Sequence, residues 1–468
     1  MTLFPVTSFE NYMLMDNHPG YEMVILIEWA FRGRINKELI LEAYNRVTQY
    51  EPLLRSVLVK QKGKRYWNVD DQYRIPISFE TTDESVEQDE GTRYVFPSSP
   101  EERCGKIIIR QYRDGVSFGI YAHHAIGDGL GLHQFFADWM KEYDLLLHGQ
   151  TDTSELNFHP DPDLFVRREE MHFAPEPTPQ QEVKTPTKKQ SVFSKIMSDI
   201  YNGVGQFFCR RVMPLLPNKK IDKSRIVELS PMYWRRFGED FFLKYKAKAK
   251  SCGASFNSLM IRDMYLALRK WIEKHPIDNK PVERQKRWFR MLVPMNIRSD
   301  FHRTVPCANI LGYIFLDRRP VECDRSEQFL NRIQFDMTNC KKYHLGALFV
   351  SGLHFFEKIP GFISLMTSER QCHCSIILSS VGNICKSCQQ EEYRTNDDIR
   401  IEHDQYPLQL IRLLGAPPNR PHTPISIGVM QRQHDAFVSC RYDANVMTEE
   451  TMLEFFNMFA DEMMKSIE

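Results

Sequence analysis

The apolar positions along this chain change their period several times, and each change predicts a different element. Residues 21–31, YEMVILIEWAF, form an apolar run of strand length. Apolar residues then recur at helical spacing over 39–47, with Asn36 placed as an N-cap and Pro52 as a stop. A polar, acidic stretch over 81–91 predicts a loop. Strand and helix therefore alternate from the start of the chain.

A hairpin and a long helix follow this loop. The runs 106–112 and 116–123 are separated by an Asp-Gly pair at 114–115, which favours an antiparallel hairpin. Apolar residues at helical spacing then run from Leu132 to Leu147, and Gly149 is placed to end that helix.

The character of the chain changes after residue 150. Pro, Lys, Gln and Thr dominate 151–190, which is typical of a linker or crossover. The following segment, 191–217, carries apolar residues at helical spacing together with basic ones. It is either an amphipathic helix that lies on a membrane or lines an apolar channel, or a packed crossover helix. The packed crossover helix is the simpler interpretation.

A second alternation of elements begins near residue 225. Residues 225–229 are strand-like, Pro231 is placed at a helix start, and Ser255 is placed as the cap of a further helix. Strands are predicted over 290–300, 309–316, 372–383 and 426–443, and a last helix over 449–466. We therefore predict an α/β (α+β) fold with two lobes, 1–150 and 225–468, each a mixed sheet flanked by helices, joined by a crossover over 151–224.

Composition supports a globular protein with a cleft between lobes. The chain has 468 residues, too many for one ordinary core, and 42% of them are hydrophobic. Lys plus Arg and Asp plus Glu each number 61, so net charge gives no reason to expect nucleic acid as a partner. We find no apolar stretch of spanning length and no secretory leader, and expect a cytoplasmic monomer.

Cysteines raise the question of a metal site. Eleven are scattered along the chain, and Cys372, Cys374, Cys385 and Cys388 form CxC and CxxC pairs near His373. Tetrahedral zinc is one interpretation of this cluster. Free thiols in a reducing compartment are the simpler one, so we predict no metal.

The most informative residues read HHAIGDG, from His123 to Gly129, at the junction between the predicted hairpin and the long helix. If the strand alternation persists, His124 continues the apolar face, where burial would keep it a neutral base. Asp128 is placed to pair with His124 or to cap the helix. An ordinary core histidine beside an ordinary N-cap is the alternative interpretation.

This segment resembles the HHxxxDG motif of the CoA-dependent acyltransferase superfamily. That superfamily includes chloramphenicol acetyltransferase-like folds, nonribosomal-peptide condensation domains, alcohol acetyltransferases and wax ester synthase-like acyltransferases. EPLLRS at 51–56 is similar to the HPLLRS-type segment, with Glu51 where His is common. LVPMNIRS at 292–299 resembles the PxNxR segment, and ILSSVGN at 377–383 the SNxG-type strand. The DFGWG box of the plant branch is absent.

The resemblance implies two chloramphenicol acetyltransferase-like lobes around a tunnel, and acyl transfer from a thioester to an alcohol or amine without an acyl-enzyme. It implies no bound cofactor; acyl-CoA or a phosphopantetheine thioester would be the co-substrate. The implied site residues are His124 as general base, His123 as its support, Gly129 in the motif, Asp128 as a structural partner of Arg298, and Asn296, Ser379 and Ser380 as oxyanion or tunnel groups. Two alternatives remain: a stand-alone condensation domain acting with a carrier protein, and a non-catalytic binding protein that keeps the fold.

Overall fold

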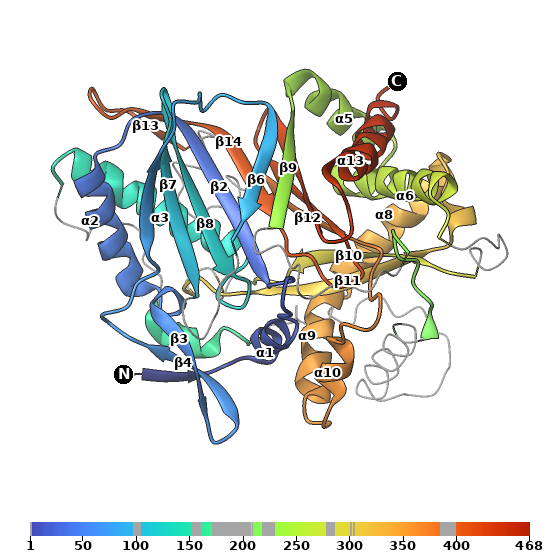
Figure 1. Cartoon of the computed structure of the whole chain (residues 1–468), viewed down its shortest axis with the longest axis horizontal. Coiled ribbons are helices and arrows are strands. Elements are labelled where there is room, and N and C mark those ends of the chain that lie inside the picture. Colours follow the sequence, from blue (N-terminus) through green and yellow to red (C-terminus); the bar gives the residue numbers. More distant parts are fainter. Residues whose placement is uncertain are drawn as a thin grey trace, which may run out of the picture.

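The computed structural model has two lobes, each built on one large sheet (Figure 1). It describes residues 2–96, 104–150, 161–170, 207, 209–217, 230–277, 286–299, 302, 305–383 and 399–468. Helices cover the outer faces of both sheets, and the inner faces meet in the middle of the molecule. The predicted two-lobed α/β architecture is therefore confirmed.

The first lobe contains a six-stranded sheet in the order β13-β14-β2-β8-β7-β5. All its neighbours are antiparallel except β5 and β7. Its outer face packs on α2 and α3, each begun by the predicted side-chain cap. The elements are β2 (Val24–Gly33), α2 (Lys37–Val47), β5 (Ile77–Thr81), β7 (Gly105–Gln111), β8 (Gly115–His123), α3 (Gly129–Leu147), β13 (Arg400–Ile401) and β14 (Leu408–Ala416). The predicted hairpin is confirmed as β7–β8.

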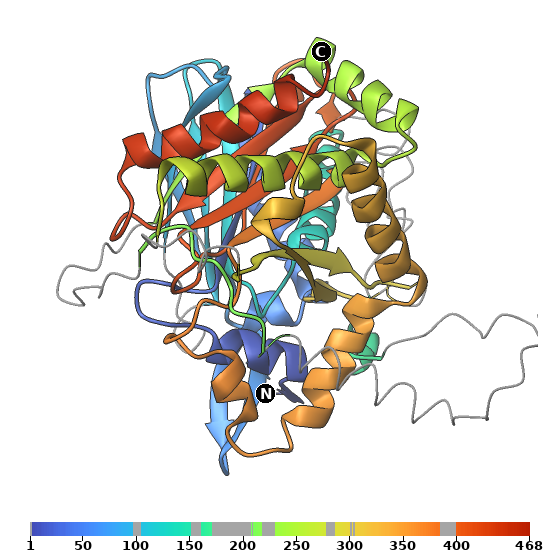
Figure 2. The same ribbon diagram turned by 90° about the vertical axis from the view of Figure 1, so that its right-hand side faces the viewer.

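The second lobe contains a seven-stranded mixed sheet in the order β11-β10-β12-β15-β16-β9-β6. Its outer face is covered by α5, α6, α8 and α13, and Figure 2 shows α6 and α13 lying across the strands. The elements are β6 (Glu90–Val95), β9 (Ser230–Phe237), α5 (Glu239–Ser251), α6 (Phe256–Lys274), β10 (Phe289–Asn296), β11 (Leu311–Arg318), α8 (Glu327–Lys342), β12 (Ile376–Asn383), β15 (Ile425–Gln431), β16 (Ala436–Tyr442) and α13 (Glu449–Met464).

A third, smaller group of elements lies at the lower end of the molecule (Figure 1). It combines a three-stranded sheet, β1-β4-β3, with three helices. The elements are β1 (Thr2–Pro5), α1 (Ser8–Met15), β3 (Ser56–Gln61), β4 (Lys64–Val69), α9 (Leu345–Phe356) and α10 (Phe362–Met366). Short 3₁₀ turns cover Thr48–Tyr50, Leu53–Arg55, Pro162–Arg167 and Pro320–Glu322.

The two large sheets exchange strands, and β13 belongs to the first sheet together with β14. β6, from the first part of the chain, pairs with β9 in the second sheet, and β14, from the last part, pairs with β2 in the first sheet. Each lobe therefore includes main-chain hydrogen bonds to a strand from the other half of the sequence. Because β-sheet hydrogen bonds fix register as well as position, this exchange sets how the two lobes face each other.

The two sheets come to backbone distance where β14 meets β15, at two glycines. A Cβ atom built on Gly428 would lie 1.9 Å from the carbonyl oxygen of Gly415, and one built on Gly415 would lie 2.0 Å from Cε of Met430. Ser439 on β16 donates to the same Gly415 carbonyl. Only residues without a side chain allow this backbone approach.

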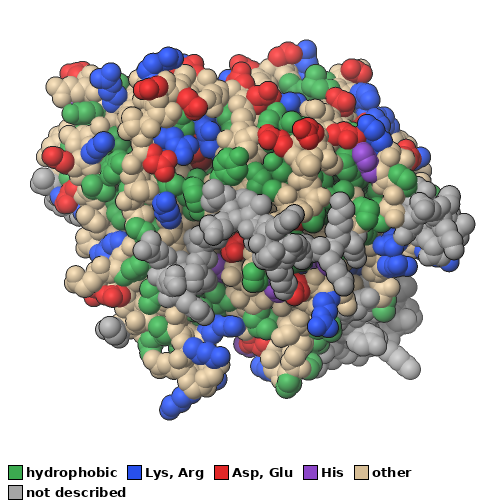
Figure 3. All heavy atoms as spheres, viewed as in Figure 1, with side chains coloured by type: hydrophobic (Ala, Val, Ile, Leu, Met, Phe, Trp, Pro, Cys, Tyr) green, Lys and Arg blue, Asp and Glu red, His purple; other side chains and the backbone are tan. Residues whose placement is uncertain are grey.

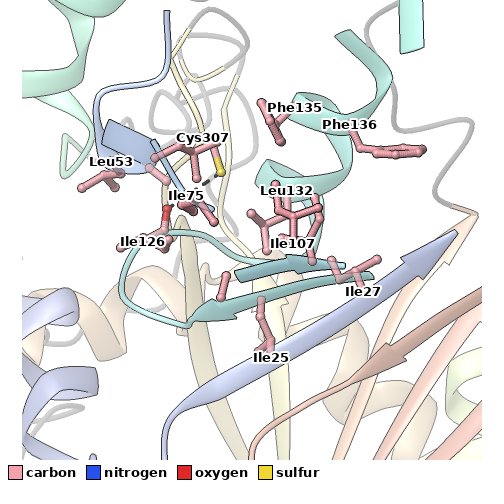
Figure 4. Close-up of a cluster of buried hydrophobic side chains, with 14 of the residues drawn as sticks. Ile25, Ile27, Leu53, Ile75, Ile107, Ile126, Leu132, Phe135, Phe136 and Cys307 are labelled. Carbon is pink, nitrogen blue, oxygen red and sulfur yellow. Dashed lines mark hydrogen bonds between the residues drawn. The ribbon is translucent and has the colours of Figure 1, made fainter. Parts of the chain in front are cut away.

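The core of the first lobe lies between its sheet and α3. Figure 4 shows Ile25 and Ile27 of β2 facing Leu132, Phe135 and Phe136 of the helix. These are the apolar stripes that the sequence predicted, and all five side chains are buried. Cys307, from a distant part of the chain, completes this core beside Ile126.

The prediction for Pro231 is wrong, and two other predicted segments lie wholly or mostly outside the described residues. Pro231 does not begin a helix; it lies in β9 opposite Tyr94, next to the residues that pair with β16, where a missing N–H is tolerated. The predicted strand 225–229 and most of the segment 191–217 lie outside the described residues. In the described part of the chain, no helix has both the length and the apolar character needed to cross a bilayer.

The glycine crossing yields a stability prediction. Gly428→Ala should lower the free energy of unfolding by about 2–3 kcal/mol, because the new methyl group meets backbone that cannot rotate away. Gly352→Ala in α9 is the matched control, since a Cβ there meets no atom within 4 Å. We expect that variant to gain about 0.5–1 kcal/mol from its helical position. Urea unfolding measures both, and equal stability of the two variants would contradict the close crossing.

Candidate functional site

The motif residues occupy the sharp turn between β8 and α3, where the chain leaves the sheet. His123 is the last residue of β8 and pairs with Val24 of β2. Its side chain is fully buried, and its Nδ1 accepts from the backbone N–H of Ala125 at 3.2 Å. Burial lowers the pKa of His123 to about 3. His123 is therefore a neutral residue inside the turn.

His124 is held by three backbone-directed contacts. Its own N–H donates to the carbonyl of Met23 at 2.6 Å, and Asn309 Nδ2 donates to its carbonyl at 2.7 Å. Its Nδ1 lies 3.1 Å from the carbonyl oxygen of Gly127. The Asn309 amide nitrogen lies 3.2 Å from the same Nδ1. Because a carbonyl oxygen only accepts, the Gly127 contact is satisfied by the tautomer with its proton on Nδ1, in which Nε2 is the basic nitrogen.

Burial also determines the charge of His124. The side chain is only 7% exposed, and this burial lowers the pKa of His124 below its ordinary value, although the carboxylate of Asp128 opposes the shift. The ring is thus a neutral base with an oriented lone pair. This is the state that the alternation along the strand predicted.

Asp128 does not bond to His124 but joins the two lobes. One carboxylate oxygen accepts from the N–H of Gly131 at 2.8 Å, which caps α3, and the other accepts from the N–H of Ile310 at 2.8 Å. The Arg298 guanidinium donates to both carboxylate oxygens, from Nη1 at 2.7 Å and from Nη2 at 2.8 Å. Burial tends to raise the pKa of Asp128, but Arg298 and the backbone donors outweigh it and hold the pKa below its usual range.

The glycines of the motif leave room for this arrangement. A Cβ on Gly127 would lie 2.9 Å from Sγ of Cys307, and one on Gly131 would lie 2.9 Å from the carbonyl oxygen of Ala308. Residues 307–310 therefore press against the motif turn from the second lobe. A Cβ on Gly129 would instead lie 3.3 Å from Cγ2 of Val381, on the wall of a pocket.

His124, Asp128 and Gly129 line a pocket between the two sheets. The cavity volume of this pocket is about 120 Å³. Apolar side chains of both sheets form its walls, among them Ile25, Ile27, Leu292, Ile377 and Met430. Arg298 and the three polar residues predicted for the tunnel, Asn296, Ser379 and Ser380, line the same pocket. The structure thus brings together all the predicted site residues except His123.

The three polar residues differ in what they offer to a ligand. Asn296 Oδ1 accepts from the N–H of Arg298 at 3.1 Å, so its amide N–H₂ is the group left to donate. Ser380 donates its hydroxyl to Asn257 Oδ1 at 3.0 Å. Asn296 and Ser379 are therefore better placed than Ser380 to donate to a ligand.

Sequence reasoning missed several residues that support the turn. Asn309 holds His124, and Glu51, noted only as a departure from the motif, accepts from the N–H of Cys307 at 2.6 Å. Burial raises the pKa of Glu51 well above its ordinary value, which favours the protonated carboxylic acid. Arg420 also lines the pocket and is paired with Asp16. No spacing signal links such distant positions.

The cysteine cluster shows no metal geometry in the described residues. Cys372 lies 3.2 Å from the carbonyl of Cys374, whose own thiol lies 3.5 Å from the Thr423 hydroxyl. Burial raises the pKa of both thiols. No group of three metal-binding side chains occurs among the residues that the structure describes, and Cys385 and Cys388 lie outside them.

Solved structures with the same architecture are known, although their sequences differ widely from this one. No family model and no curated protein matches the chain. Among solved structures, it is similar to the first condensation domain of the calcium-dependent antibiotic synthetase, in complex with a substrate analogue (TM-score 0.66, 12% identity, covering 100% of this chain and 96% of that one). It is also similar to SgcC5 from Streptomyces globisporus, in complex with an aryl ethanediol and sucrose (TM-score 0.60, 14% identity, covering 99% and 98%).

A third similar structure belongs to a larger protein. It is the nonribosomal peptide synthetase FmoA3 bound to AMPPNP, with a TM-score of 0.61 and 13% identity. The match covers all of this chain and 42% of that one, so this chain spans less than half the length of the synthetase. At such identities the comparisons establish the architecture alone. The chain has the two-lobed fold of condensation domains, as its motif predicted.

Proposed function

We propose that this protein transfers an acyl group from a thioester to an alcohol or amine, with His124 as the general base. One observation carries the proposal: His124 is a buried ring on the wall of the pocket, and in the tautomer that donates from Nδ1 to the Gly127 carbonyl its Nε2 is the basic nitrogen. A base fixed in this way needs no prior deprotonation at neutral pH.

The reaction proceeds in two proton transfers. The acceptor hydroxyl or amine gives its proton to Nε2 of His124 as its oxygen or nitrogen attacks the thioester carbonyl. The tetrahedral intermediate then collapses, the carbon–sulfur bond breaks, and the thiol leaves with the proton from the imidazolium. Because the acceptor attacks directly, the protein forms no acyl intermediate.

The oxyanion of that intermediate needs a donor. The amide of Asn296 and the hydroxyl of Ser379 lie on the second-lobe wall of the same pocket as His124. A fixed donor at this position would stabilise the developing negative charge more than it stabilises the ground state. The apolar walls formed by Ile25, Ile27 and Ile377 suit an acyl chain without charge.

The thioester carrier distinguishes two forms of this proposal. One donor is acyl-CoA; the other is an acyl or peptidyl group on the phosphopantetheine of a carrier protein. The second form is favoured by two of the similar structures, a condensation domain of an antibiotic synthetase and the nonribosomal peptide synthetase FmoA3. The diol bound to SgcC5 is compatible with an alcohol acceptor in either form. Side-by-side assay of acyl-CoA, acyl-pantetheine and acylated carrier protein decides between them.

His124→Ala is the direct test of the base. We expect the rate of thiol release, in the presence of an alcohol and amine library, to fall by roughly 10²–10⁴-fold. His148→Ala, at the exposed C-terminal end of α3, is the control and should keep the parent rate. An active parent with an unaffected His124→Ala variant would remove this residue from the mechanism. Calorimetry showing thioester binding without any turnover would favour a binding protein.

The pH profile tests the charge state. Burial lowers the pKa of His124 below 6.5, so the base stays neutral as the pH falls through that value. We expect kcat/KM to decline only at lower pH, as the imidazole finally takes up a proton. The residual rate of His124→Ala should lack this acidic limb. A midpoint above 6.5 in the parent would contradict a buried neutral base.

The bridge between Asp128 and Arg298 should act on stability as well as on rate. Asp128→Ala should cost about 3 kcal/mol of unfolding free energy, because it leaves a partly buried guanidinium without its partner. Arg298→Ala in the same background should cost less than it does alone, with a coupling energy above about 1 kcal/mol. Denaturant unfolding of the four proteins measures this. Additive losses would mean that the pair does not join the lobes.

A further inference from the structure

The lower end of the molecule carries two projections that the proposed reaction does not use. One is the tip of the β3–β4 hairpin, and the other is the turn between α9 and α10 (Figure 1). Figure 2, turned by a quarter, keeps both at the same end. A flat partner placed below the molecule would therefore meet the two together.

The hairpin tip is basic throughout. Its residues read KQKGKR over 60–65, and Figure 3 shows basic side chains gathered there. Lys60, Lys62 and Lys64 are exposed, and none has an ion-pair partner among the residues that the structure describes. Lys62 and Gly63 make the two-residue turn with positive φ, which puts Lys62 at the extreme tip.

This charge works against the hairpin itself. Lys60 lies directly opposite Arg65 in the strand register, and like charges in that position repel. No carboxylate within 60–65 offsets them. A surface that keeps such a cluster unneutralised is complementary to an anionic partner.

The second projection is apolar. Phe355, Ile359 and Leu365 are 44%, 47% and 45% exposed around the α9–α10 turn. Lys358 beside them is exposed, whereas Glu357 turns away to accept from the hydroxyl of Ser8 on α1. Large apolar side chains at a convex tip, next to a lysine and without a free acid, suit insertion between lipid headgroups.

We propose that these two tips form a docking surface for an anionic membrane. The lysines of the hairpin contact acidic headgroups while the α9–α10 turn enters the interface with its apolar side chains. A planar membrane surface contacts both projections at once. A small folded protein bound to one of them would leave the other without a partner. This surface is separate from the pocket, so the proposal stands whether or not the acyl transfer proposed above is correct.

Vesicle flotation tests it with the full-length protein. We expect binding to phosphatidylcholine vesicles that contain about one-third phosphatidylserine, and weaker binding as salt rises. Changing Lys60, Lys62 and Lys64 to Gln should lower the partition coefficient by roughly a hundredfold. Ile359→Asp should lower it by roughly tenfold and, because the position is exposed, should leave the circular dichroism spectrum unchanged.

A matched set of changes lies at the opposite end of the molecule, on α5 (Figures 1 and 2). Leu243 is 47% exposed, like Ile359, and Lys246, Lys248 and Lys250 are exposed beside it. Leu243→Asp with these three lysines changed to Gln should bind vesicles as the parent does. If this control lost as much vesicle binding, the effect would come from net charge alone, and the proposal would be overturned. A parent that ignores vesicles but binds an acidic helical carrier protein through the same tips would also overturn it.

Discussion

The ion pair between Asp128 and Arg298 is the interaction on which the site depends. Asp128 belongs to the motif turn of the first lobe, and Arg298 follows β10 of the second. The carboxylate also caps α3 and accepts from the N–H of Ile310. Because one buried anion satisfies donors from both lobes, the helix start, the motif turn and residues 307–310 are held in one arrangement.

That arrangement fixes the chemistry of His124. Residues 307–310 bring Asn309 to the histidine carbonyl, and the compact turn brings the Gly127 carbonyl to Nδ1. The ring is therefore oriented by its neighbours and kept neutral by burial. The aspartate acts on the base through the backbone rather than by direct contact, which explains why it lies four residues away and faces the other lobe.

Larger features hold the lobes in position for this pair. The exchanged strands β6 and β14 tie each sheet to the other half of the chain, and Gly415 and Gly428 allow the sheets to cross at backbone distance. The pocket opens beside that crossing, between β2 and β14 on one side and β12 and β15 on the other. Strands from both sheets therefore form most of its wall, together with the motif turn and the segment that follows β14.

The sequence by itself determined the local elements and the motif. Period-2 and helical patterns predicted β7, β8, α2, α3 and α6, because the caps and apolar stripes that form them lie within a few residues of each other. The motif resemblance also predicted the partner of Asp128. Only the tertiary structure decided the strand exchange, the roles of Glu51 and Asn309, and the strand that holds Pro231. These depend on contacts between residues far apart in the chain, for which no local periodicity carries a signal.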